Sequence, residues 1–183
     1  ALPRSIDLVV TMLAILKSGC TYIYIDPKET NKRLKFIAFN ANVQAIVTLS
    51  DQNEKYNSLG SSSLKLVNLD EEKGEIAEME SSNLDVLFSP ITPTHIIYSS
   101  SPIKPVGIPF YSKTILNELN WLWNNYPFGL REISCQIASP SRIEFVTEIW
   151  APLLKGITNI LVPDDIVLDP ERLVEFLTEI HVT

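Results

Sequence analysis

The sequence THIIYSSSPIKPVGIPF, residues 94–110, contains two short apolar runs separated by a polar loop. Residues 96–98 form a run typical of a buried strand, and the apolar residues of 106–110 predict a second strand. The residues between them include serine, proline and lysine. In α/β proteins a strand that ends in such a loop often presents backbone N–H groups and hydroxyls to a phosphate. This loop is not a Walker loop, because no Gly-Lys-Ser/Thr leads into a helix.

The overall composition is that of a soluble globular protein. The 183 residues suffice for one domain with a sizeable core, and hydrophobic and charged residues make up 45% and 20% of them. The net charge of -7 argues against nucleic acid or an anionic membrane surface as the partner. Because no apolar run approaches the roughly 18 residues of a membrane span, we expect no membrane segment.

The cysteines and histidines suggest neither a disulfide framework nor a zinc site. Cys20 and Cys135 are isolated thiols, which fits a reducing compartment. His95 and His181 have no further metal ligand nearby at the usual spacing. The sequence opens at Ala1 with no recognisable secretory leader, so we expect a cytoplasmic protein and a piece of a longer one.

Helical and strand patterns alternate in the first half. Residues 5–18 predict an amphipathic helix with Ser5 as N-cap and Gly19 as its stop. Its expected inward residues are Ile6, Val9, Val10, Leu13 and Leu16. A helix is also predicted over 31–41, and strands over 21–25, 44–49 and 65–69. The acidic stretch 70–80 is either a solvated loop or short exposed helix, or a cation site.

The second half continues the alternation. Helices are predicted over 113–126, 147–155 and 169–180, the last opened by Asp169-Pro170-Glu171, with strands over 132–138 and 158–162 and a further strand from Val182. This rhythm predicts a layered α/β fold, with a mainly parallel sheet and helices on both faces. The residues expected in its core are Leu13, Ile46, Ile96, Ile97, Leu119 and Leu153.

Two stretches resemble motifs of adenylate-forming enzymes, which include the amino-acid-activating domains of nonribosomal peptide synthetases. Residues 98–107, YSSSPIKPVG, resemble the phosphate loop Tyr-Thr-Ser-Gly-Ser-Thr-Gly-x-Pro-Lys-Gly but are one residue shorter. Ser101 stands where the family has glycine, Val106 where it has lysine, and a second glycine is lost or replaced by Ile103. Residues 16–27, LKSGCTYIYIDP, are similar to the motif Leu-Lys-Ala-Gly-x-Ala-Tyr-x-Pro-x-Asp-Pro.

The second half resembles a subgroup of these domains that includes enzymes activating β-alanine. The similar segments, in order, are LNELNWLWNNYP (116–127), Cys135-Gln136, EIWAPLLKG (148–156), VPD (162–164) and Asp169-Pro170. Counting back four residues from Glu148 places the substrate-amine Asp of that subgroup at Glu144. Glu144 either pairs with a substrate ammonium group or is a surface residue favoured at a helix start.

The resemblance implies part of the N-terminal subdomain of an adenylation domain, spanning 1–183. The family joins a carboxylate to the α-phosphate of ATP, with Mg²⁺, and releases pyrophosphate. The implied phosphate-binding residues are Ser99, Ser100, Ser101, Lys104 and Gly107, and the implied partners are a small amino acid, the rest of the domain and a carrier domain. Two functions stay open. The chain is either a ligase fragment, inactive on its own, or a non-catalytic relic that binds a nucleotide or a partner.

Overall fold

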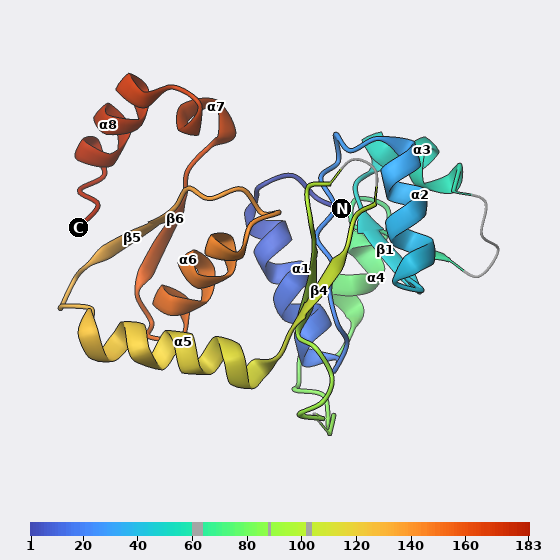
Figure 1. Cartoon of the computed structure of the whole chain (residues 1–183), viewed down its shortest axis with the longest axis horizontal. Coiled ribbons are helices and arrows are strands. Elements are labelled where there is room, and N and C mark those ends of the chain that lie inside the picture. The colour runs from blue at the N-terminus through green and yellow to red at the C-terminus, as the bar shows by residue number, and fades with distance from the viewer. Residues whose placement is uncertain (60–63, 88, 102–103) are drawn as a thin grey trace.

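The computed structural model describes residues 1–59, 64–87, 89–101 and 104–183 (Figure 1). Its elements, in chain order, are α1 (Ile6–Lys17), α2 (Asn31–Asn40), β1 (Ala45–Thr48), the 3-10 helix η1 (Ser50–Gln52), α3 (Asn53–Asn57), β2 (Lys65–Asn68), α4 (Lys73–Glu78), β3 (His95–Tyr98), β4 (Gly107–Phe110), α5 (Ser112–Asn125), β5 (Ile133–Gln136), α6 (Ile143–Leu153), β6 (Thr158–Leu161), α7 (Asp164–Val167) and α8 (Pro170–Glu179). The predicted α/β class is confirmed.

Within the described residues the strands form three two-stranded sheets rather than the single sheet that the sequence suggests. β1 pairs with β2 and β5 pairs with β6, both in parallel, whereas β3 and β4 form an antiparallel hairpin. The parallel pairs have helices between their strands, and the hairpin has only the short loop after Tyr98. Parallel pairing requires a crossover connection, so this difference follows from the connection lengths.

The strand predicted over residues 21–25 does not form a ladder. Tyr22 makes one parallel bridge to His95, with its N–H donating to the Thr94 carbonyl at 3.2 Å. Tyr22 belongs to one hydrophobic cluster and Ile25 to another, so this extended segment packs between two cores. The β-branched and aromatic run therefore predicted the burial of Tyr22 and Ile25 correctly. A hydrogen-bonded ladder does not form, because β3 pairs with this segment at one residue only.

The first helix has the predicted ends and a different buried face. The Ser5 side chain accepts a hydrogen bond from the Leu8 N–H, and Gly19 follows the helix with φ of 75°. Leu8 and Met12 are the buried residues of α1, and its exposed large apolar residues are Ile6, Val10 and Leu13. Because α1 is apolar almost all round, periodicity alone did not identify the face that tertiary contacts bury.

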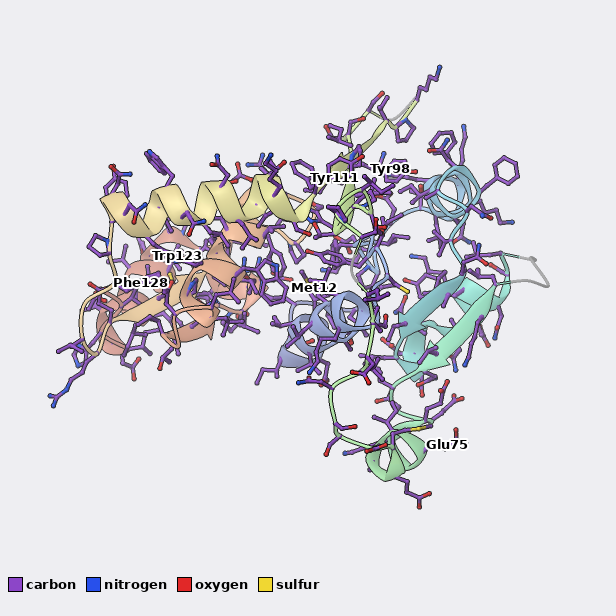
Figure 2. All side chains as sticks on the ribbon, turned by 90° about the horizontal axis from the view of Figure 1, so that it is seen from below. Met12, Glu75, Tyr98, Tyr111, Trp123 and Phe128 are labelled. Carbon is purple, nitrogen blue, oxygen red and sulfur yellow. The ribbon has the colours of Figure 1, made fainter. Side chains whose placement is uncertain are left out.

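Two hydrophobic clusters of described residues form the core of the chain. The larger one joins α1 to α5 and α6 through the buried residues Leu2, Leu8, Met12, Tyr22, Leu119, Phe145, Val146, Ile149, Trp150 and Ala151. The smaller one lies between α2, α3 and β1 and contains Ile25, Leu34, Ile37, Ile46 and Tyr56. Figure 1 shows α1 between the half that contains α5 and α6 and the half that contains α2 and β1, and Met12 lies at this centre in Figure 2.

The predicted core residues divide into three groups. Ile46 and Leu119 are buried, Ile96 and Ile97 are half-buried, and the remaining two, Leu13 and Leu153, are exposed by 46% and 43%. Leu153 is the last residue of α6, whose buried face is formed by the preceding residues. The predictions for Leu13 and Leu153 were therefore wrong.

The remaining differences lie near the ends of elements. α6 begins at Ile143 rather than Thr147 and includes Pro152, which has no N–H to donate to the Glu148 carbonyl one turn earlier. The side-chain amide of Asn159 donates to that carbonyl instead, at 2.9 Å. No strand starts at Val182, although the Thr183 N–H donates to the Ile133 carbonyl at 3.1 Å. The acidic stretch contains α4, which has no buried residue and from which Glu75 projects away from the rest of the molecule (Figure 2). In the described parts of the chain no helix is both long and apolar enough to cross a membrane.

Candidate functional site

A cavity of about 670 Å³ lies against the carboxyl end of β3. Its volume falls within the range of small-molecule sites, about 300–1,000 Å³. One wall comes from β3 and the residues after it, a second from α2 and the turn before it, and a third from the start of α6. The charged side chains that line it are Asp26, Glu29, Lys32, Arg33 and Arg142.

Arg33 ties the loop after β3 to α2. Its guanidinium donates to the carbonyl oxygens of Ser99 at 2.8 Å and Ser101 at 3.2 Å. The same group pairs with Glu29 one turn earlier at 3.0 Å, and the Arg33 side chain is only 19% exposed. The loop therefore turns two carbonyl groups toward a paired cation, which fixes its position over the cavity.

The serine hydroxyls also fasten this loop. The Ser99 Oγ accepts from the Val106 N–H at 3.0 Å, and the Ser101 Oγ accepts from the Lys104 N–H at 3.4 Å. A hydroxyl that accepts one bond still has its own hydrogen to donate. Both hydroxyls thus brace the turn, and that of Ser99, which lines the cavity, retains a donor for an anion.

The predicted phosphate-binding residues are neighbours in the sequence, but only some of them lie at the cavity. Ser99 and Ser100 line the cavity, whereas Ser101, Lys104 and Gly107 are not among its lining residues. Gly107 lies in β4 opposite Tyr98, where an added Cβ would come within 3.0 Å of the Tyr98 ring. Its observed role is therefore close packing in the hairpin. Pro102 and Ile103 lie outside the described residues, and so does the position that corresponds to the family's second glycine.

Glu144 lies apart from this cavity. It stands in the first turn of α6 and is exposed, while its neighbours Phe145 and Val146 are buried and line the cavity. The charged residue that reaches the cavity ahead of them is Arg142. The side of α6 that faces the cavity is thus apolar, and the cationic Arg142 precedes it at the start of the helix.

Sequence reasoning missed the charged residues that line the α2 side of the cavity, including Arg33, which holds the loop. Asp26, Glu29 and Arg33 all line the cavity, and none of them was predicted as a site residue. The pair Glu29 and Arg33 has the i, i+4 spacing of a helical ion pair, which was the available signal. The pairing of Arg33 with carbonyls some 66 residues later was visible only in three dimensions.

A second polar network fixes the third wall. One carboxylate oxygen of Glu148 accepts from the backbone N–H groups of Ile137 and Ala138, both at 2.8 Å, and from the Gln136 amide at 3.0 Å. Arg4 donates to the carbonyls of Gln136 and Ile137 and contacts the Gln136 side-chain oxygen. This network positions the segment that leads to Pro140, Ser141 and Arg142 at the cavity.

The most buried polar residue that lines the cavity is His95. Its ring stacks between Tyr22 and Phe110 at centroid distances of 5.2 and 4.8 Å, and the residue is 1% exposed. Burial lowers the pKa of His95 from 6.5 to about 4, so the ring is neutral near pH 7. In the described part of the chain no three His, Cys, Asp or Glu side chains gather as a metal site.

The sequence matches a known family along its whole length. The family model for "AMP-binding enzyme" matches residues 1–183. Among curated proteins, a linear gramicidin synthase of Brevibacillus parabrevis is 31% identical over 189 residues, and bacitracin synthase 1 of Bacillus licheniformis is 28% identical over 181 residues. These matches cover 100% and 98% of this chain, but 2% and 3% of those proteins.

Solved structures show the same fold at lower identity. The nonribosomal peptide synthetase FmoA3 superposes with a TM-score of 0.84 at 17% identity, covering 100% of this chain and 19% of its own. The o-succinylbenzoate CoA synthetase of Bacillus subtilis superposes with a TM-score of 0.80 at 12% identity, covering 100% of this chain and 46% of its own. The family model, which spans every residue, identifies the chain as a member of the AMP-binding enzyme family.

Proposed function

We propose that this chain forms the phosphate-binding side of a site at which an amino-acid adenylating ligase works. In that reaction a substrate carboxylate oxygen attacks the α-phosphorus of ATP, the bond to the β-phosphate oxygen breaks, and pyrophosphate leaves. The proposed products are an acyl adenylate and pyrophosphate. Family membership supports the reaction class, and the proposed substrate is a small amino acid such as β-alanine.

The observation that carries this proposal is the combination of hydroxyls and cations around one cavity. Ser99 and Ser100 line it next to the loop, and Lys32, Arg33 and Arg142 bring positive charge to its walls. Phosphoryl transfer depends mainly on positioning and on charge stabilisation, which these groups supply. Arg33 is already paired with Glu29, so Lys32 and Arg142 are the proposed cations for the phosphates.

The residues present fit the phosphates better than they fit a metal. Mg²⁺ is commonly held by one or two carboxylates together with substrate phosphates. Asp26 and Glu29 line the cavity, and Glu29 is engaged by Arg33. We therefore assign no residue of this chain to Mg²⁺ and propose that the ion enters with ATP, where it neutralises charge on the phosphates.

A binding measurement with matched lysine variants tests the phosphate role. Lys32 and Lys35 are both exposed on α2, but Lys32 lines the cavity and Lys35 does not. We expect Lys32→Gln to weaken ATP binding about five- to tenfold, as loss of one charge-assisted contact should. Lys35→Gln should leave the dissociation constant unchanged, as measured by isothermal titration calorimetry. Equal effects of the two substitutions would refute the proposed phosphate site.

The isolated 183-residue chain is proposed to lack turnover. Two features of the loop support this: Val106 stands where the family has lysine, and Ser101 where it has glycine. We expect no amino-acid-dependent exchange of labelled pyrophosphate into ATP, with β-alanine or any standard amino acid. Restoring the loop to Gly-Ser-Thr-Gly-Lys-Pro-Lys-Gly should not rescue exchange in this chain, because the Tyr-Gly-x-Thr-Glu segment of the family does not occur in its sequence. Exchange above a no-enzyme blank would contradict the prediction.

The alternative is a non-catalytic module that binds a nucleotide or a partner. The contacts of Arg33 favour it, because this cation is committed to the Ser99 and Ser101 carbonyls and to Glu29. ATP binding without exchange in every longer form of the protein would support this alternative. Exchange in a longer form would support the ligase.

The other predicted site residues, the partners and the location of the protein are also part of this proposal. Ser101, Lys104 and Gly107 would shape the loop rather than contact phosphate, and Glu144 would pair with the substrate amine if a further segment brought the two together. The rest of an adenylation domain and a carrier domain are the proposed partners, and the cytoplasm is the proposed location. Cys20 and Cys135, both free thiols, agree with a reducing compartment.

A further inference from the structure

A lysine outside the cavity holds the turn that precedes α2. The ammonium group of Lys55, in α3, donates to the backbone carbonyls of Pro27 and Glu29, the latter at 2.6 Å. In the described parts of the chain no backbone N–H donates to either carbonyl. Asp26 and Glu29 of this turn line the cavity, whereas Lys55 is not among its lining residues. The turn is therefore held by charge-assisted hydrogen bonds that come from outside the cavity.

The neighbours of Lys55 give α3 a fixed place. Tyr56 is 2% exposed and belongs to the smaller hydrophobic cluster, through which α3 packs against α2 and β1. Asn53, the first residue of α3, accepts from the side-chain amide of Asn68 at 3.0 Å and donates to the Glu71 carboxylate at 2.8 Å. The backbone that carries Lys55 is thus fastened on both sides of that residue.

Glu29 connects Lys55 to the loop after β3. Lys55 binds the backbone carbonyl of Glu29, and Arg33 pairs with its carboxylate at 3.0 Å. Arg33 then donates to the carbonyls of Ser99 and Ser101. We call Lys55, Glu29 and Arg33 the positioning network. A displacement of the turn at Glu29 would move the partner of Arg33, and with it the loop.

We propose that Lys55 is a positioning residue of the phosphate site, acting through Glu29 and Arg33 on the loop that carries Ser99. This inference rests on the proposed function of the cavity. Without the ammonium group two backbone carbonyls lose their charged donor, so the turn gains freedom and the Ser99 hydroxyl loses its fixed place. A site that must be ordered during binding has lower affinity than one that is already ordered. Lys55 therefore strengthens ATP binding without contacting ATP.

Nuclear magnetic resonance relaxation in the absence of nucleotide tests the network. The Nε–H of Arg33 pairs with Glu29 at 3.0 Å, and the Nε–H of Arg4 pairs with Asp164 at 2.8 Å in a separate network. In Lys55→Met the ¹⁵N order parameter of the Arg33 Nε–H should fall below about 0.6, the range of flexible groups, and that of Arg4 should not change. Equal falls would show a general loosening, and an unchanged Arg33 would show that Lys55 does not act on the pair. Either result overturns the proposal.

Calorimetric titration with ATP tests the effect on the site. Lys55→Met should raise the dissociation constant about five- to tenfold, and Lys55→Arg, which keeps a charged donor, should restore most of the affinity. Lys73→Met removes the same charge from an exposed position of α4, a helix without buried residues, and should leave the dissociation constant unchanged. Equal effects of the two methionine substitutions would refute the role of Lys55.

The Arg33→Met background shows whether the effect passes through the network. There Lys55→Met should change the dissociation constant by less than about twofold, because the contact that it supports is already gone. An undiminished loss would show that Lys55 acts directly through its charge, and would overturn the proposal. If the unchanged chain does not bind ATP, the proposed function fails, and the relaxation comparison of Arg33 with Arg4 still decides whether Lys55 holds the network.

Discussion

At the scale of single residues, His95 links stability to pH. Its folded pKa of about 4 lies below the ordinary value of 6.5, because burial disfavours the charged ring. The unfolded chain therefore binds more protons, and stability is complete above pH 6.5 and falls as the pH drops toward 4. Between pH 7 and pH 5 we expect a loss on the order of 2 kcal/mol in the free energy of unfolding. Urea denaturation at the two pH values measures it, and His95→Phe should remove most of the difference. An equal loss in the variant would show that other groups cause it.

Arg4 is the second residue whose effect is predictable. Its side chain is 5% exposed, donates to the carbonyls of Gln136 and Ile137, and pairs with Asp164. Arg4→Met should lower the free energy of unfolding by about 2–4 kcal/mol, because these buried acceptors lose their donors.

An exposed arginine serves as the control for this measurement. Arg172 pairs with Asp165 at 3.0 Å, but their side chains are 52% and 68% exposed. Arg172→Met should cost about 1 kcal/mol or less, as exposed ion pairs do. Similar losses for the two variants in denaturant melts would show that the buried network does not stabilise the chain.

At the scale of elements, two glycines end helices in the left-handed region and differ in their surroundings. Gly19 follows α1 with φ of 75°, and a Cβ there would lie 2.6 Å from Cγ1 of Val86. Gly156 follows α6 with φ of 71°, and among the described residues no atom beyond its chain neighbours lies within 4 Å of its ideal Cβ. Gly156→Ala should cost about 1 kcal/mol from backbone strain alone, and Gly19→Ala about 2–3 kcal/mol because Val86 must also move. Thermal melts compare the stabilities of the two variants. An equal loss of stability would mean that the segment around Val86 moves aside without cost.

At the scale of the whole molecule, the exposed apolar surface predicts self-association of the 183-residue chain. Ile6, Val10 and Leu13 are exposed by 73%, 58% and 46% on one helix, and exposed patches of this kind promote association. We expect light scattering to show oligomers at micromolar concentration and a low, broad thermal transition.

One added charge tests the role of this helix. Val10→Lys should reduce association without lowering the free energy of unfolding, because Val10 is exposed. Asn120→Lys places the same charge on an exposed position of α5 and should have little effect. A monodisperse, sharply melting unchanged chain would contradict the association prediction.

Local chemistry in the sequence determined the element types, the caps and the family. Ser5 and Asp169 cap their helices as predicted, because capping depends on a side chain and the backbone two or three residues later. The motifs of residues 16–27 and 98–107 pointed to the adenylate-forming family for the same reason, since each is a contiguous run. Tertiary structure alone decided which face of α1 is buried, because nearly every face of that helix is apolar. It also decided that Arg33 holds the loop after β3 and that the Nε2 of His95 stays unpartnered among the described residues. Both depend on groups far apart in the sequence, which no local pattern encodes.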